Sequence, residues 1–151
     1  MKRVKGGTKI IRMQVPINTY DNKVQLFDGK FTTGYKVVDL QISPRSPTEN
    51  NEVLVRLSTA KDSGNPVAYW DWSDTRQIAW ARWGAPNAAA FGMEKVIDDD
   101  NMIIEDLWVS NYSTIDTGAI QVLITLQKYE FTAWDGAGTM VRNQSQAGPP
   151  A

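Results

Sequence analysis

Apolar and polar residues alternate along most of this chain with a period of two, and turn-forming residues separate the alternating segments. In residues 8–17 one face carries only apolar side chains, those of Ile11, Met13, Val15 and Ile17. Successive side chains of a strand point to opposite faces of a sheet, so this segment is predicted to be an amphipathic strand. Pro16 lacks a backbone N–H, which places the end of the strand at a sheet edge or a bend.

The same alternation recurs at short spacing through the rest of the chain. Further strands are predicted over residues 23–27, 30–33, 35–43, 52–59, 67–72, 76–83, 94–97, 102–110 and 119–132. We expect residues 67–72 and 76–83 to form a hairpin, and residues 84–91 to form a loop because they contain Gly and Pro. Tyr129 and Phe131 follow the apolar face of the last strand and require a bulge or a second buried surface.

About eight short strands, with no long helix and no internal repeat, are typical of an all-β fold. The pattern predicts a single-domain antiparallel β-sandwich. An eight-stranded jelly roll matches it best, with an immunoglobulin-like sandwich or a small barrel as alternatives. The length of 151 residues fits one domain. We expect a basic N-terminal arm over residues 1–9, the sandwich over residues 10–132, and a short helix or irregular tail over residues 133–151.

Composition removes several classes of function. The chain contains neither cysteine nor histidine, which excludes disulfides, cysteine nucleophiles, Ser-His-Asp triads and histidine-ligated metals. Sixteen Lys and Arg against seventeen Asp and Glu give a net charge of −1, so no strong overall attraction to nucleic acid or to an anionic membrane is expected. No signal peptide or transmembrane segment is predicted, because no apolar run is long enough. No cofactor and no enzymatic activity are expected.

The basic N-terminus is the first candidate site. Its five cations are Lys2, Arg3, Lys5, Lys9 and Arg12, and no acidic residue lies among them. Such an arm can neutralise the phosphates of a nucleic acid with release of counterions, or it can dock onto a neighbouring subunit. A solvated terminus is the simpler interpretation, and it assigns no function to these charges.

A cluster of large aromatic side chains is the second candidate site. Within the predicted hairpin lie Tyr69, Trp70, Trp72, Trp80 and Trp83. Rings of this kind stack on sugars or pack against a neighbouring protein. Cross-strand packing inside the sandwich is the alternative that requires no ligand.

Carboxylates supply the third candidate, a weak calcium site at Asp98, Asp99 and Asp100. Calcium takes about six to eight oxygen ligands, and this run lacks the spacing and the glycine of an EF-hand loop. A solvated turn is therefore favoured over a metal site. Asp71 and Asp74 have the residue type of a glycosidase acid and base, but pairs of this kind are common on protein surfaces.

The basic arm, the compact sandwich, the turn-rich loops and the polar tail together resemble the single jelly-roll structural proteins of icosahedral viruses, in particular of bacteriophages. Residues 96–108, Val-Ile-Asp-Asp-Asp-Asn-Met-Ile-Ile-Glu-Asp-Leu-Trp, resemble the loop-to-strand passages of such proteins. The resemblance implies a non-enzymatic capsid, vertex or cement subunit that assembles with itself and with other virion proteins. Its sandwich sides, loops and terminal arms would form the contacts, and it would be made in the host cytoplasm and end in the virion. The alternative function is a carbohydrate-binding sandwich that uses the Trp-rich hairpin.

Overall fold

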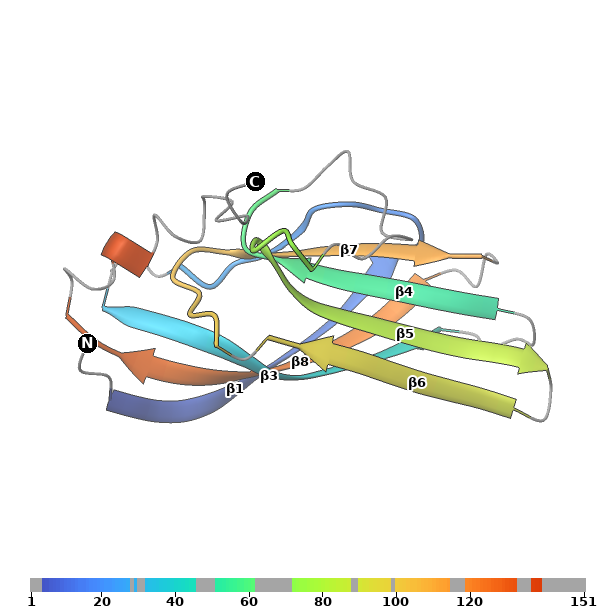
Figure 1. Ribbon diagram of the computed structural model, residues 1–151, viewed down its shortest axis with the longest axis horizontal. Helices are drawn as coiled ribbons and strands as arrows, with labels where there is room; N and C mark the ends of the chain where they lie inside the picture. The colour runs from blue at the N-terminus through green and yellow to red at the C-terminus, as the bar shows by residue number, and fades with distance from the viewer. Residues whose placement is uncertain are drawn as a thin grey trace.

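The protein folds into two β-sheets packed face to face, as the computed structural model in Figure 1 shows. The structure describes residues 4–27, 29, 32–45, 51–61, 72–87, 90–98, 100–114, 119–132 and 137–139. Eight strands lie in these residues, and every ladder between them is antiparallel. The predicted all-β antiparallel sandwich is therefore confirmed.

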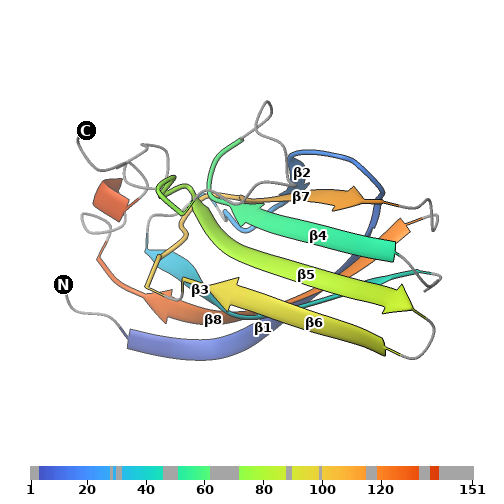
Figure 2. The same cartoon turned by 45° about the vertical axis from the view of Figure 1, so that its right-hand side comes forward.

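The two sheets differ in size. The three-stranded sheet has the order β1 (Val4–Pro16), β8 (Ala119–Glu130) and β3 (Thr33–Pro44). The five-stranded sheet has the order β2 (Asn22–Val24), β7 (Leu107–Ser113), β4 (Asn51–Ser58), β5 (Gln77–Asn87) and β6 (Ala90–Ile97). Figure 2 shows β4, β5 and β6 in front of the three-stranded sheet. The first and the last strand of the chain are neighbours, and β1 forms one edge of its sheet.

The connectivity agrees with a jelly roll in part. In an ideal jelly roll the chain doubles back as one long hairpin, so strand 1 pairs with 8, 2 with 7, 3 with 6 and 4 with 5. The ladders β1–β8, β2–β7 and β4–β5 are present. In the described residues β6 pairs with β5 instead of β3, and the β3 and β6 edges meet through an ion pair between Asp39 and Lys95. The sandwich thus has three strands in one sheet and five in the other, and the jelly roll is not confirmed.

The core lies between the sheets and consists of the apolar face of each strand. Leu40, Val55, Leu57 and Ile124 are fully buried there, as the period-two alternation predicts. At the β1 edge the covering is incomplete, because the three-stranded sheet ends there. Ile11 and Met13 pack against the core from this edge and stay partly exposed.

The hairpin in the structure is not the predicted one. Of the predicted strand over residues 67–72, only Trp72 lies among the described residues, where it belongs to a turn, and β5 forms its hairpin with β6. The predicted loop over residues 84–91 is wrong, because its two ends belong to these strands. Gly84 pairs with Gly92, and the ladder is irregular between Gly84 and Asn87. Pro86 lies in this irregular stretch, where a residue without an N–H costs the ladder no hydrogen bond.

The predicted strand over residues 102–110 begins later, at Leu107. Met102, Ile103 and Ile104 are buried in succession, which an alternating strand does not allow. The backbone of Ile103 exchanges two hydrogen bonds with Tyr35, of 2.9 and 2.7 Å, and so ties this segment to β3. Met102 and Ile104 join Phe131 in a second small core, beside Tyr129. The predicted second buried surface at the end of the last strand is thereby confirmed.

The C-terminal region is described only at residues 137–139, which form a single helical turn. Within the part of the chain that the structure describes, no helix has the length and apolar character needed to cross a membrane.

Candidate functional site

The predicted basic arm is partly a strand. Lys5, Lys9 and Arg12 belong to β1, and residues 4–16 pair with β8. The register shifts between Lys5 and Thr8, so the two glycines there form a bulge. All three cations are exposed. Lys2 and Arg3 lie outside the described residues. The positive charge is therefore held along the edge of a sheet rather than on a free tail, at least from residue 4 onward.

One side of β1 has no neighbour among the described strands, and two hydrogen bonds reveal which backbone groups face that side. Phe131 donates its N–H to Thr32, and Ala119 accepts from the N–H of Arg45, both at 2.9 Å. The backbone N–H and C=O groups of successive residues in a strand point alternately to its two sides. The odd-numbered residues of β8 therefore bond to β3, and its even-numbered residues bond to β1.

The register then assigns the backbone groups of β1. Its odd-numbered residues, such as Ile11 opposite Ile124, bond to β8. The N–H and C=O groups that point away from β8 belong to Thr8, Ile10, Arg12 and Gln14. We call these four residues the free edge of β1. Pro16 is next in the same series, and it has no N–H to leave unpaired.

The free edge is open to solvent. Thr8, Arg12 and Gln14 are exposed, and the side chain of Ile10 is 60% exposed. Figures 1 and 2 show the N-terminal part of β1 along the border of its sheet. A long edge strand with an exposed apolar side chain is the kind of surface on which another strand adds.

The sheet also brings lysines from other strands to the N-terminal end of β1. Lys9 lies 5.8 Å from the ring centroid of Tyr35, and Lys36 lies 5.5 Å from that of Tyr129. Lys128 packs close to Gly6. Lys36 and Lys128 were not singled out from the sequence, because their proximity to the arm depends on the pairing of β1, β8 and β3. By the strand register, Lys9 and Lys128 lie on the core-side face of the sheet, whereas Lys5 and Lys36 lie on its outer face, where Lys36 is also 4.0 Å from Asp100. We call these four lysines the cationic end of the three-stranded sheet.

The predicted aromatic cluster is divided between three environments. Trp83 faces the core and is buried. Trp80 lies on the opposite face of the five-stranded sheet, where its Nε1 donates a hydrogen bond to Gln77 at 3.0 Å. Trp72 is 65% exposed and meets Trp80 edge to face, with ring centroids 6.2 Å apart. Tyr69 and Trp70 lie outside the described residues. Of the three described rings, Trp72 alone offers a broad surface to a ligand or a partner.

Asp74 precedes β5 and is almost fully buried. Its Oδ1 accepts hydrogen bonds from the backbone N–H and from Nε of Arg76, both at 3.0 Å, and its Oδ2 accepts from Nη2 at 2.9 Å. Burial alone would raise the pKa of Asp74, but the hydrogen bonds from Arg76 and the charges of Arg76 and Arg56 outweigh it and hold the pKa below its ordinary value of 3.8. This carboxylate anchors a turn, and Asp71, its predicted glycosidase partner, lies outside the described residues.

A pocket of about 400 Å³ lies beside β7 and is mostly polar. Its lining residues are Ala60, Lys61, Arg76, Glu105, Asp106 and Trp108. The ammonium groups of Lys61 and Lys23 lie 5.3 and 6.0 Å from the ring centroid of Trp108. Asp106 binds Lys23 at 3.1 Å and accepts the backbone N–H groups of residues 26 and 27. The sequence patterns did not single out this pocket, since its residues come from separate segments.

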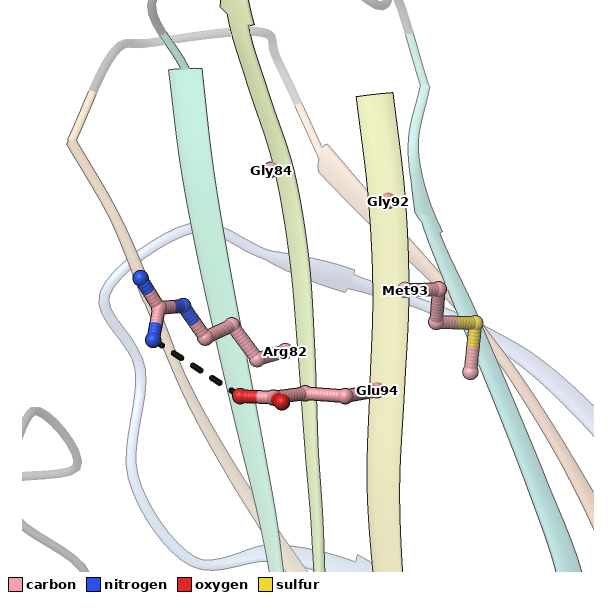
Figure 3. Close-up of a pocket in the computed structure, with 5 residues that line it drawn as sticks. All are labelled: Arg82, Gly84, Gly92, Met93 and Glu94. Carbon is pink, nitrogen blue, oxygen red and sulfur yellow. Dashed lines mark ion pairs between the residues drawn. The ribbon is translucent and has the colours of Figure 1, made fainter. Parts of the chain in front are cut away.

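A second pocket, of about 330 Å³, lies over β5 and β6 (Figure 3). Gly84 and Gly92 leave the sheet surface bare there. Figure 3 shows Arg82 and Glu94 side by side, with Met93 pointing away from them. Arg82 pairs with Glu94 at 3.6 Å and with Glu52 of β4 at 3.3 Å. The charged groups of this pocket thus neutralise one another.

The acidic run forms a turn. Asp98 accepts hydrogen bonds from the backbone N–H of Asp100 at 3.2 Å and from the side chain of Asn101 at 2.6 Å. Asp100 is 96% exposed and lies 4.0 Å from Lys36. Asp99 is outside the described residues. Within the residues that the structure places, no three acidic side chains gather in a way that could hold a metal ion.

Comparisons with known proteins identify no relative from which a function can be transferred. No protein-family model matches the chain, and no match to it was found among curated proteins or among solved structures.

Proposed function

We propose that the protein is a non-enzymatic structural subunit of a virion that assembles with copies of itself. The free edge of β1 is the observation that carries this proposal. It presents four consecutive outward-facing residues of an exposed strand, with Ile10 60% exposed among them. Monomeric proteins usually shorten, cover or bend such an edge, because it is a template for pairing with another chain.

The layout of the fold supports the virion role. The ladders β1–β8, β2–β7 and β4–β5 are those of a jelly roll, and the chain resembles jelly-roll virion proteins in its arm and loops. A capsid, vertex or cement subunit has to present surfaces to its neighbours and needs no catalytic group. The absence of cysteine and histidine suits such a role.

The cationic end of the three-stranded sheet supports an accessory contact with nucleic acid. Lys5, Lys9, Lys36 and Lys128 come from three strands and lie near two tyrosine rings. The ammonium groups of such lysines can bind the phosphates of a nucleic acid. We expect this contact to weaken steeply with added salt, whereas subunit association through hydrogen bonds and apolar side chains should not.

Light scattering on the purified protein tests the proposal. The mass is measured across protein and salt concentrations, for the full chain and for a variant that lacks residues 1–3, so that β1 stays intact. A discrete oligomer or a closed shell supports a structural subunit. A strict monomer at all protein concentrations would refute it.

A glycan-binding module is the second candidate, and the pocket beside Trp108 favours it. The Trp108 indole lines this pocket together with Glu105 and Lys61, whose polar groups can bind hydroxyls. A sugar that stacks on the ring would replace the lysine ammonium groups that lie over it. Trp72 is a second exposed ring. A glycan panel titrated against the protein and against Trp108→Ala and Trp72→Ala variants tests this function. Binding that either variant abolishes would establish it, and no binding across a broad panel would exclude it.

A further inference from the structure

The geometry of the free edge points to a specific dimer: we propose that two copies pair antiparallel along β1, about a twofold axis at Ile11. The two three-stranded sheets would then join into one continuous sheet. This inference rests on the proposed function, because it names the surface through which the subunit associates. It follows from the directions of the backbone groups, from the charges along the strand and from the apolar side chains at its edge.

The backbone groups favour this register. With Ile11 on the axis, Ile10 lies opposite Arg12 of the second copy, and Thr8 lies opposite Gln14 of the second copy. All outward-facing N–H and C=O groups of the free edge then exchange hydrogen bonds in antiparallel pairs. A twofold axis perpendicular to the sheet also keeps both apolar faces on the same side, as the cores of the two copies require.

The neighbouring registers satisfy fewer groups. Moving the axis to Arg12 places two arginines directly opposite each other, and like charges in such pairs are destabilising. It also uses Pro16, which has no N–H. Moving the axis to Ile10 brings Gln14 opposite Gly6, in the bulge where the strand is irregular. The register centred on Ile11 avoids both defects.

The charges along β1 agree with the same register. Lys9 lies opposite Met13 of the second copy, and Arg12 lies opposite Ile10 of the second copy, so each cation faces an apolar side chain. The aliphatic part of a Lys or Arg side chain packs on such a neighbour while its charge stays in water. Edge lysines commonly protect a strand against pairing. In this protein the cations of β1 disfavour some pairing registers but do not prevent the free edge from pairing.

The apolar side chains at the edge would become more buried in the dimer. Ile11 and Met13 are only partly buried in the single subunit, and Ile10 is 60% exposed. In the dimer the two Ile11 side chains meet across the axis on the core side of the sheet. The two Ile10 side chains pack against arginine stems on the outer side. The second copy therefore completes the incomplete covering of the core at the β1 edge.

Cysteine crosslinking tests this register, and the chain contains no cysteine that could interfere. Across the axis Ile11 forms a non-hydrogen-bonded pair with itself, for which the Cα atoms are about 4.5 Å apart, within disulfide range. An Ile11→Cys variant is therefore expected to form a covalent dimer under mild oxidation. Met13→Cys lies on the same face of the same strand, but in this register the two cysteines are about 14 Å apart. It is the matched control and should stay uncrosslinked.

Crosslinking between two different cysteine variants tests the register independently. Lys9→Cys and Met13→Cys chains should crosslink when mixed and neither should crosslink alone, because residue 9 of one copy faces residue 13 of the other. Crosslinking of Met13→Cys alone, or of Lys9→Cys alone, would overturn the proposed register. If the unmodified protein forms oligomers by light scattering but neither Ile11→Cys nor the mixture crosslinks, the edge dimer is refuted and the structural-subunit proposal stands. If the unmodified protein is monomeric throughout, both proposals fail.

A charge substitution provides a test without cysteine. In Ile10→Lys the new lysine of each copy faces Arg12 of the other copy, so that each dimer contains two like-charge pairs. We expect about tenfold or greater weakening of association. Gln41→Lys is the matched control, because Gln41 is exposed on β3, which β8 separates from β1, so that this variant adds the same charge away from the free edge. Equal weakening by both variants would contradict pairing through β1.

Discussion

Asp74 is expected to be one of the main polar anchors of the fold, and its removal should lower the free energy of unfolding measurably. Asp74→Ala removes a carboxylate that is 2% exposed and that accepts three hydrogen bonds from Arg76. It also removes a negative charge that interacts with the fully buried Arg56. Breaking a buried ion pair by removing one partner costs about 3–5 kcal/mol. Folded domains are stable by about 5–15 kcal/mol in total.

Urea unfolding followed by tryptophan fluorescence measures this loss. A cost of about 3–5 kcal/mol corresponds to a fall in Tm of about 6–20 °C for a domain of this size. Asp74→Asn keeps the shape of the side chain but not its charge, and we expect it to lose a smaller part of the stability. A loss below about 1 kcal/mol for Asp74→Ala would refute the assignment of Asp74 as an anchor.

The pH dependence gives a second reading of the same residue. The pKa of Asp74 is lower in the folded protein than its ordinary value of 3.8. A carboxyl group with a depressed folded pKa stabilises the fold at pH values above its unfolded pKa, and this contribution is lost as the pH falls through the folded value. The unmodified protein should therefore lose stability below about pH 4 more steeply than Asp74→Asn does. Parallel acid profiles for the two proteins would contradict the assignment.

Further predictions follow from side chains in contrasting environments. Trp83→Ala should cost about 3–5 kcal/mol because Trp83 is buried in the core. Trp72→Ala should cost only about 0.5–1.5 kcal/mol, because Trp72 is 65% exposed and loses little besides its edge-to-face contact with Trp80. Thermal unfolding compares the two variants. Gly34→Ala should destabilise by about 1–3 kcal/mol, since a Cβ there would lie 2.8 Å from Met102 and 2.9 Å from Phe131. Gly84→Ala meets open space and should be neutral or slightly stabilising in the same urea titration. Equal effects at the two glycines would show that the crowding at Gly34 is not real.

The sequence predicted the parts of this fold that depend on local alternation. The alternating residues of two strands lie in the core, as a period of two requires: Val53, Val55 and Leu57 of β4, and Ile120, Val122, Ile124 and Leu126 of β8. The boundaries of β5 and β6 were missed, because glycine and proline are also common in loops and only the ladder shows that Gly84 pairs with Gly92. Residues 102–104 carry apolar side chains without alternation, and their burial depends on Tyr35 and Phe131 from distant parts of the chain.

The candidate surface was predictable only in part. The cations at positions 5, 9 and 12 are visible in the sequence, but their placement along an exposed edge depends on the pairing of β1 with β8, which links the two ends of the chain. The separation of Trp72, Trp80 and Trp83 likewise depends on the sheet, since Trp80 and Trp83 are on opposite faces of the same strand. Trp108 lies in a pocket whose residues are far apart in the sequence. Pairing of distant segments is set by the whole chain and leaves no local pattern.

Amide hydrogen exchange at single residues of β1 tests the central claim most directly, because one strand supplies both the signal and its control. The amides of Lys9, Ile11 and Met13 bond to β8 and should be protected at every protein concentration. The amides of Thr8, Ile10, Arg12 and Gln14 face the free edge and should exchange fast in dilute protein. We predict that these four become protected as the concentration rises and the mass increases. Association without any new protection at these four residues, or protection of them already in the dilute monomer, would contradict assembly through β1.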